Sequence, residues 1–327
     1  MRISSFLQTP FVSHDDKNMI YISVADWDMC NPYEVNIYIQ GEAVFSEKIF
    51  AAEFSAMIPV CQGESTAVVS ITPFEDTPIE SEFLITPPKH WEIPLLYSSH
   101  EDLGYCAYIE KLHYESYEYL KKAIELCQKH DGFKYTVEHF WWLDAFDSYA
   151  TEQEKAELKT LISQKKIDVN AVHSGVHTSW ANSEELVRGM YFSCHEAKEK
   201  YGISPKCALF VDLSGASWSA VNAYSDMGVK YIGILPNGFR NSRENENIPP
   251  IFWWEDKLGN SRLLLWYQRA YRQYGLDRIW CDTLRQYPEG KFYFDTTKML
   301  KTEKWFSERI SKLEPCGYDI LPISFYY

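Results

Sequence analysis

The sequence contains no run rich in Lys and Arg, no apolar run long enough to cross a membrane and no closely spaced pair of cysteines. Its formal net charge is -14 at pH 7, whereas binding to phosphate groups requires a positive surface. We therefore expect neither nucleic acid nor a membrane as a partner. A neutral polar ligand fits this charge better.

Eight cysteines are scattered through the chain without a CxxC pair or the cysteine density of a small secreted protein. The first residues, MRISSFLQTPFVSHDD, lack an uninterrupted apolar segment and an obvious small-residue cleavage site, so they do not resemble a signal peptide. We therefore expect reduced thiols in a cytoplasmic protein. The alternative, that several cysteines pair in an exported protein, is open at this point.

Two domains are expected for a chain of 327 residues. Residues 17–88 contain short β-rich runs that alternate in character and are separated by polar or glycine-containing turns. They show no convincing helical period. We therefore predict a small β-sandwich domain over residues 1–90, for which packing or homo-oligomerisation is the expected role.

A different pattern begins after residues 86–94, TPPKHWEIP, whose prolines mark a domain boundary. Short apolar segments now alternate with long amphipathic segments, which is typical of a parallel α/β sheet. The expected strands lie in IPLLYS, YTVEHFWWL, IDVNAV, ALFV, YIGIL, IFWW, LLLWY and DILPISF. The expected helices span residues 108–129, 152–163, 183–200, 216–227 and 301–313. We predict an α/β fold, an incomplete (β/α) barrel over residues 91–327.

Polar residues that follow two of these strands form the candidate site. In barrels the reacting groups lie where strands end, because the loops vary there while the strands hold them rigidly. His100 and Asp102 follow the strand at 93–98, and Asp212 follows the strand at 208–211. One imidazole nitrogen and two carboxylates suit zinc or a similar divalent cation. The alternatives are a solvated or helix-capping His-x-Asp pair and, for Asp212, an N-cap carboxylate.

Aromatic rings and loop imidazoles provide candidates for substrate contact. Flat apolar rings suit the C–H faces of sugars, and imidazoles in a loop can line a pocket. The candidate substrate-binding residues are Tyr105, Trp142, His173, His177 and Trp254. Most aromatic side chains are nevertheless expected in the core. Glu138 and Asp144 are interpreted as solvated or strand-supporting carboxylates.

These motifs resemble those of glycoside hydrolase family 38, the α-mannosidases. HEDLGY (100–105) resembles the H-x-D-x-G-aromatic motif that opens the catalytic region of this family. EKYGISPKCALFVDLSGAS (199–217) is similar to its nucleophile motif, in which D-x-x-G-x-S follows a strand. Further similar segments, in the same order, are ANSEELVRG, MGVKYI and FWWEDKLGNSRLLLWY. Several ordered motifs over residues 93–270 make chance a poor explanation.

The resemblance implies a metal-dependent retaining glycosidase that acts on terminal α-mannosides of a mannose-containing glycan. It implies that His100, Asp102 and Asp212 bind zinc, or another divalent cation, and that Asp212 is also the nucleophile. It places Tyr105 at the position of a sugar-stacking tryptophan. The implied reaction passes through a covalent glycosyl-enzyme.

The sequence departs from the family pattern towards its end. Family members are much longer, and a further histidine ligand comes from the part that this chain lacks. The last residues, Ser324, Phe325, Tyr326 and Tyr327, include no carboxylate where the acid/base aspartate is expected. We therefore assign no general acid. We expect a fragment of a longer protein that binds metal weakly and turns over slowly or not at all.

Two other functions are open on this evidence. A metal-dependent carbohydrate deacetylase would also surround a divalent ion with Asp and His, but would activate water, and HSGVH (173–177) is its only candidate histidine motif. A non-catalytic carbohydrate-binding protein would keep the aromatic pocket without the acid. The sequence contains no glycine-rich phosphate loop, GxSxG segment or HExxH motif.

Overall fold

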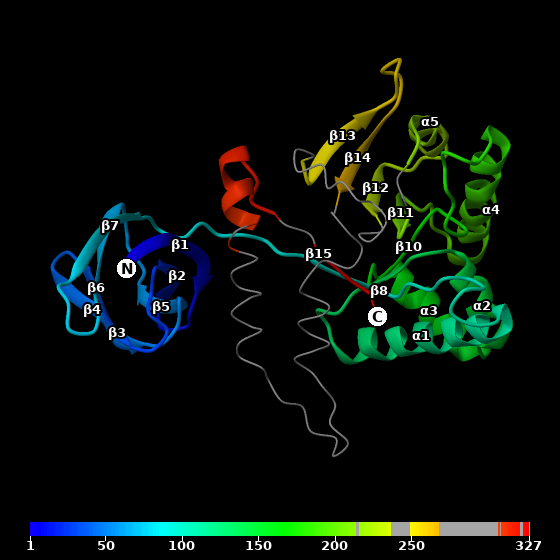
Figure 1. The fold of residues 1–327 in the computed structure, drawn as a ribbon. Coiled ribbons are helices and arrows are strands. Elements are labelled where there is room, and N and C mark those ends of the chain that lie inside the picture. The colour runs from blue at the N-terminus through cyan, green and yellow to red at the C-terminus, as the bar shows by residue number, and fades with distance from the viewer. Residues whose placement is uncertain (214–215, 237–248, 268–306, 308, 321–322, 327) are drawn as a thin grey trace. The chain divides into compact units, whose positions relative to one another are not determined.

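The computed structural model describes residues 1–213, 216–236, 249–267, 307, 309–320 and 323–326 (Figure 1). The protein is a mixed α/β protein with several sheets. It divides into two compact units, the first made of Met1–Pro94 with Arg278–Leu321 and the second of Leu95–Asp277 with Pro322–Tyr327. Within the described ranges, no helix combines the length and the apolar character that crossing a bilayer requires.

Two antiparallel sheets form the N-terminal part of the first unit (blue to cyan in Figure 1), with the strand orders β1-β2-β5 and β4-β3-β6-β7. Their strands are β1 (Arg2–Val12), β2 (Lys17–Ala25), β3 (Tyr33–Ile39), β4 (Glu42–Ile49), β5 (Glu53–Pro59), β6 (Ser65–Thr72) and β7 (Ile79–Ile85). Alternate side chains, such as Ile20 and Ile22 of β2 and Val35 and Ile37 of β3, are fully buried in one hydrophobic cluster. The alternation in the sequence thus produces a core that both sheets share.

Neither β1 nor β5 is expected from the sequence pattern. The pairing of β1 with β2 shifts register at two places, which breaks the alternation that a sequence pattern needs. Pro10 is tolerated in β1 because this strand lies at the edge of its sheet. In β5 the buried alternate positions are Phe54, Ala56 and Ile58, and the small side chain of Ala56 weakens the apolar signal.

The strands of the second unit run mainly parallel. Two groups have the orders β15-β8-β9-β10 and β11-β12-β14-β13, and β13 alone among these described strands pairs antiparallel. The strands are β8 (Leu95–Ser98), β9 (Tyr135–Val137), β10 (Ile167–Val169), β11 (Cys207–Val211), β12 (Tyr231–Leu235), β13 (Ile251–Glu255), β14 (Arg262–Tyr267) and β15 (Ile323–Tyr326). A backbone hydrogen bond of 2.8 Å from Ala171 N to Cys207 O joins the two groups beside β10 and β11.

Helices pack on the outer side of these strands (Figure 1). The α-helices of this unit are α1 (Ile109–Lys129), α2 (Trp141–Tyr149), α3 (Glu152–Ser163), α4 (Ser183–Tyr201) and α5 (Trp218–Asp226), and residues 309–313 of the first unit are also helical. Capping boxes of Thr151 with Glu154 and of Asn182 with Glu185 begin α3 and α4, and Gly202 ends α4 with a left-handed φ of 71°. Because these signals are local, the predicted bounds of both helices agree with the structure to within one residue.

The parallel strands curve around a shared interior. Their inner face borders a cavity of about 210 Å³ whose lining comes from every strand between β8 and β14. Leu96 of β8 and Trp266 of β14 pack against one cluster that contains Leu209 of β11. A flat sheet would keep these side chains apart, so the sheet bends strongly. The curved row of described strands does not close into a ring, since the strands at its two ends, β15 and β13, each have one neighbour.

The prediction that the segment FWWL (140–143) belongs to a strand is wrong. The strand β9 ends at Val137, and α2 begins at Trp141. Trp142 and Phe146 lie on the buried side of this helix, so core packing outweighs the β-propensity of aromatic residues. Trp142 is only 1% exposed within the core, and its predicted contact with substrate is therefore also wrong.

We expect Trp142→Ala to lower the free energy of unfolding by about 3–5 kcal/mol, because it leaves a large cavity in a packed core. Tyr105 is 86% exposed, and Tyr105→Ala serves as the matched control with an expected change of no more than about 0.5 kcal/mol. Urea unfolding followed by circular dichroism measures both values. Equal losses in the two variants would contradict the assignment of Trp142 to the core.

Candidate metal centre

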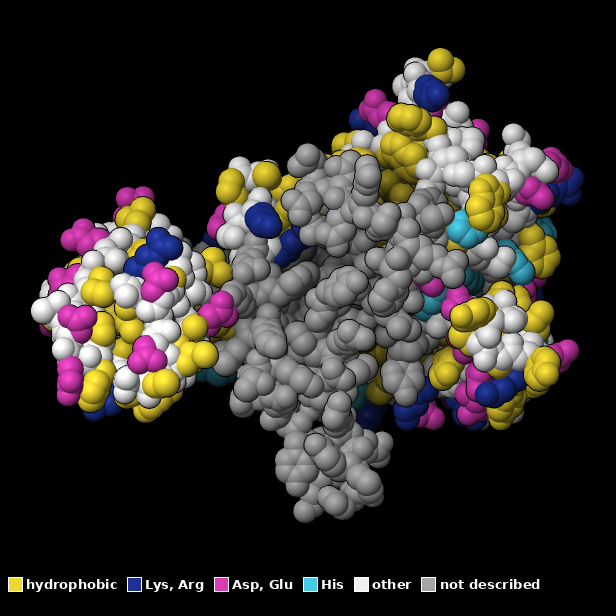
Figure 2. Space-filling model, viewed as in Figure 1, with side chains coloured by type: hydrophobic (Ala, Val, Ile, Leu, Met, Phe, Trp, Pro, Cys, Tyr) yellow, Lys and Arg dark blue, Asp and Glu magenta, His cyan; other side chains and the backbone are white. Residues whose placement is uncertain are grey.

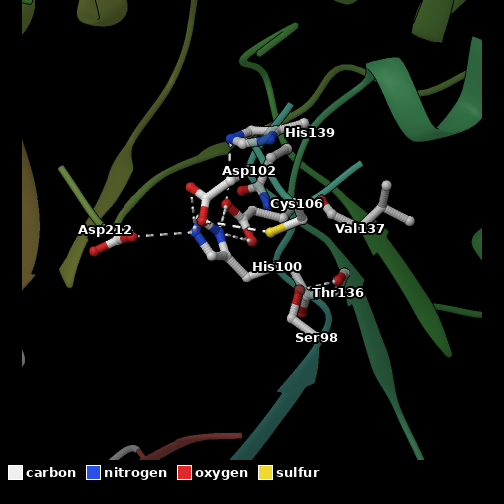
Figure 3. Close-up of polar contacts among 10 residues, drawn as sticks. Ser98, His100, Asp102, Cys106, Thr136, Val137, His139 and Asp212 are labelled. Atoms are coloured by element: carbon white, nitrogen blue, oxygen red, sulfur yellow. Dashed lines mark hydrogen bonds and ion pairs between the residues drawn. The ribbon is translucent and has the colours of Figure 1, made fainter. Parts of the chain in front are cut away.

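Two strand ends bring the three predicted metal ligands together. His100 and Asp102 lie in the loop after β8, and Asp212 directly follows β11. The Nε2 atom of His100 lies 3.8 Å from Oδ1 of Asp102 and 3.7 Å from Oδ2 of Asp212 (Figure 3). One ligand atom from each residue lies within 4.8 Å of the others. This spacing allows the three side chains to hold one divalent cation.

The backbone at Asp212 is held in an uncommon conformation. Its φ of 56° is left-handed, and its N–H donates a 2.9 Å hydrogen bond to the carbonyl oxygen of Leu235 on the neighbouring strand. Such a conformation persists for a residue other than glycine when the surrounding structure enforces it, and it is frequent at functional sites. The N-cap of α5 is Ser217, so the alternative interpretation of Asp212 as an N-cap residue does not apply.

A buried carboxylate that the sequence pattern does not single out lies behind His100. Glu138 is the first residue after β9, and its side chain is 0% exposed. Its Oε1 and Oε2 atoms accept from Nδ1 of His100 at 2.9 and 3.1 Å, and Oε1 lies 3.3 Å from Nε2 of His139. The sequence predicts a solvated or strand-supporting carboxylate at this position, and its burial excludes the solvated alternative. Its position directly after a buried strand, like that of Asp212, is the signal that identifies it.

The centre carries more negative than positive charge. Burial lowers the pKa of His100, but the hydrogen bond to Glu138 and the charges of Glu138, Asp102 and Asp212 outweigh burial, so the net shift is upward. Burial lowers the pKa of His139, which keeps that imidazole neutral. Three carboxylates around one imidazole form an arrangement that a divalent cation would neutralise, and the set of nitrogen and oxygen donors fits such an ion.

Three of the predicted substrate contacts, Tyr105, His173 and His177, lie in loops. Tyr105 is close to the metal centre, because its N–H donates a 3.1 Å hydrogen bond to the carbonyl oxygen of Asp102. His173 lies in the loop after β10, borders a cavity of about 470 Å³ and has its Nε2 3.1 Å from Oδ2 of Asp144. His177 stacks on Trp180 with ring centroids 4.6 Å apart. On the visible face of this unit, histidine and acidic side chains lie near one another (Figure 2).

Trp254 lies at the opposite edge of the sheet, and its predicted contact with substrate at this centre is wrong. It pairs with Leu263 near the start of β14, whereas Asp212 follows the end of β11. The two positions differ by about six residues along the strand direction, or roughly 20 Å. The prediction assumes that the strand runs parallel to its neighbours, but β13 runs antiparallel.

A comparison with models of protein families identifies the family of this chain. The model of the glycosyl hydrolases family 38 N-terminal domain matches residues 90–312. No curated protein matches the sequence significantly.

Two similar solved structures come from Enterococcus faecalis. An α-mannosidase of strain V583 is 14% identical with a TM-score of 0.54, and the match covers 72% of this chain and 25% of that one. A protein of glycosyl hydrolase family 38 is 13% identical with a TM-score of 0.51, and the match covers 73% of this chain and 24% of that one. At these identities the likeness shows the fold alone. The chain thus spans about a quarter of the length of each.

We expect Asp212→Asn and Asp102→Asn each to weaken zinc binding by more than about 100-fold. Loss of a residue that only orients a ligand costs roughly 10–100-fold, and each of these substitutions removes a charged ligand atom itself. Asp131→Asn is the matched control, since the side chain of Asp131 is fully exposed and Asp131 is not one of the three ligands. Isothermal titration with zinc measures the affinities. A wild-type affinity in Asp212→Asn would exclude this centre.

We also expect zinc affinity to fall as the pH falls, because a proton and the cation compete for Nε2 of His100. The pKa of His100 is raised above 6.5, so the competing proton binds already at a higher pH than it would on an ordinary histidine. Below the raised pKa the apparent affinity should drop about tenfold per pH unit for one displaced proton. Titrations across the neutral range test this slope, and an affinity that rises with acidity would contradict it.

Proposed function

Because the family model matches residues 90–312, the chain belongs to glycoside hydrolase family 38, and we propose that its metal centre serves a retaining glycosidase acting on terminal α-mannosides. The observation that carries the proposal is the convergence of His100, Asp102 and Asp212 within 4.8 Å, in the same order along the chain as the family motifs they resemble. No other group of three or more such residues that could hold a metal ion occurs in the described part of the chain.

In the proposed reaction, Asp212 acts as the nucleophile. One carboxylate oxygen attacks the anomeric carbon and forms an ester bond while the bond from that carbon to the leaving oxygen breaks. A water molecule then hydrolyses the glycosyl ester and restores the carboxylate, so that the anomeric configuration is retained. The enforced left-handed backbone and the 14% exposure of its side chain support this role, since they hold the carboxylate at a fixed, partly accessible position. A separate acid must protonate the leaving oxygen, and we assign no residue to it.

The proposed cofactor is zinc or another divalent cation. His100, Asp102 and Asp212 would hold it with one nitrogen and two oxygen ligands. When bound, such an ion supplies charge stabilisation and a point of attachment for sugar hydroxyls. Asp102 is 44% exposed and thus lies at the solvent side of the centre, whereas His100 is only 12% exposed.

A sugar is the proposed substrate because an aromatic residue adjoins Asp102 in the chain's fold and imidazole side chains lie in the loop after β10. Tyr105 adjoins Asp102 and would face the sugar ring with an apolar surface. His173 and His177 would provide polar contacts from the loop after β10. For the remainder of the chain we propose the division made from the sequence, with residues 1–90 as a β-rich domain for packing or oligomerisation and residues 91–327 as the catalytic domain.

We expect the full gene product, loaded with zinc, to release the phenol from an activated aryl α-mannoside. Asp212→Ala should lower kcat by about a thousandfold or more, because it removes the nucleophile. Metal analysis accompanies the assay, so that loss of the ion is separated from loss of the nucleophile. Asp131→Asn, with an exposed carboxylate outside the centre, is the matched control and should keep wild-type activity.

The outcomes separate the proposal from its two rivals. Zinc binding without hydrolysis of any aryl glycoside by the wild type would point to a carbohydrate-binding protein. Release of acetate from an acetylated sugar by the wild type, together with metal still bound to Asp212→Ala, would point to a deacetylase. Either result would overturn the proposed glycosidase.

A further inference from the structure

We propose that Glu138 is the positioning residue of the metal centre: its buried carboxylate fixes the ring orientation and tautomer of His100, so that Nε2 faces Asp102 and Asp212 as a ligand. Glu138 would touch neither substrate nor metal and would act through His100. The inference deepens the proposed function and rests on the metal centre that this function requires.

The geometry determines which imidazole nitrogen carries the proton. An ionised carboxylate only accepts hydrogen bonds, so Nδ1 of His100, at 2.9 and 3.1 Å from the two oxygens of Glu138, must be the donor. In the neutral ring the other nitrogen then carries no hydrogen, and its lone pair is the one that can bind a metal ion. That nitrogen, Nε2, is the atom that faces Oδ1 of Asp102 and Oδ2 of Asp212. Ligating histidines commonly have such a carboxylate behind them, which orients the ring and increases its basicity.

The partners of Glu138 support this role over a purely structural one. Its carboxylate is 0% exposed, and removing a charge from water is costly unless good partners replace the water. Within the described residues, the imidazoles of His100 and His139 lie within ion-pair distance of this carboxylate, and no Lys or Arg does. A carboxylate that stabilised the fold alone would gain more from a permanently charged partner.

Neighbouring elements hold Glu138 rigidly. The preceding strand β9 lies between β8 and β10, and Asn170 Nδ2 donates a 2.8 Å hydrogen bond to the carbonyl oxygen of Val137. His139, which contacts the same carboxylate, is buried beside Gly175, where a Cβ atom would lie 3.5 Å from its Cε1. Glu138 therefore follows a strand with a neighbour on each side, and its carboxylate contacts a second buried imidazole.

Glu138 does not belong to the ligand set itself. The residues whose ligand atoms all lie within 4.8 Å of one another are His100, Asp102 and Asp212. The carboxylate of Glu138 contacts Nδ1, while Nε2 on the other side of the ring faces the ligands. Its effect must therefore pass through the imidazole, which distinguishes it from a fourth ligand.

The test compares Glu138→Gln with wild type in the metal-free protein and in zinc titrations. Glutamine keeps the size of the side chain but can also donate to Nδ1, so the tautomer is no longer dictated. We expect zinc affinity to fall about 10–100-fold. Nitrogen NMR of labelled histidine, recorded above the pKa of His100, should show the Nδ1–H tautomer in wild type and a mixture in the variant.

Asp144→Asn is the matched control, because Asp144 contacts His173 at 3.1 Å in a similar carboxylate–imidazole pair outside the ligand set. It should leave both zinc affinity and the His100 tautomer unchanged, and thermal unfolding of each metal-free variant verifies that it folds. An Nε2–H tautomer in wild type, or wild-type zinc affinity in a folded Glu138→Gln, would overturn the proposal. Absence of hydrolysis with these two results intact would refute the proposed function alone. Absence of zinc binding by the wild type would overturn the metal centre and, with it, the role of Glu138.

Discussion

Parallel pairing of short buried strands is the constraint on which the metal centre depends. Strands β8, β9 and β10 run in one direction, and the hydrogen bond from Ala171 to Cys207 carries this arrangement on to β11. The residues that follow parallel strands reach the same edge of the sheet. His100, Glu138 and Asp212 each come after a different strand, and pairing alone brings them together from distant parts of the sequence.

The centre concentrates charge that folding alone would not favour. Glu138 is fully buried, Asp212 has a left-handed backbone, and both carboxylates lie near one imidazole. These features cost stability, and the surrounding cores offset the cost with apolar burial. The apolar clusters around the strands therefore support the part of the fold in which buried charge is concentrated.

The many aromatic residues divide between packing and exposure. Trp142 lies in the core because α2 turns its side chain inward, while Tyr105 and Trp180 project from loops and are 86% and 82% exposed. A ring that lies in a regular element at a buried position stabilises the fold, whereas one on a loop beside the centre can meet a ligand. Residue type alone does not distinguish these roles.

The sequence by itself determined the features that arise from neighbouring residues: the helices α3 and α4 with their capping boxes, the alternation of strands such as β2 and β3, and the motifs that contain His100, Asp102 and Asp212. Only the tertiary structure decided the rest. The antiparallel direction of β13 places Trp254 at the opposite edge of the sheet, and core packing makes the aromatic run at Trp142 helical. The contact of Glu138 with His100 joins residues that are 38 positions apart in the sequence. Each of these depends on contacts between distant segments, whose free energies outweigh local preference and leave no period or spacing in the sequence.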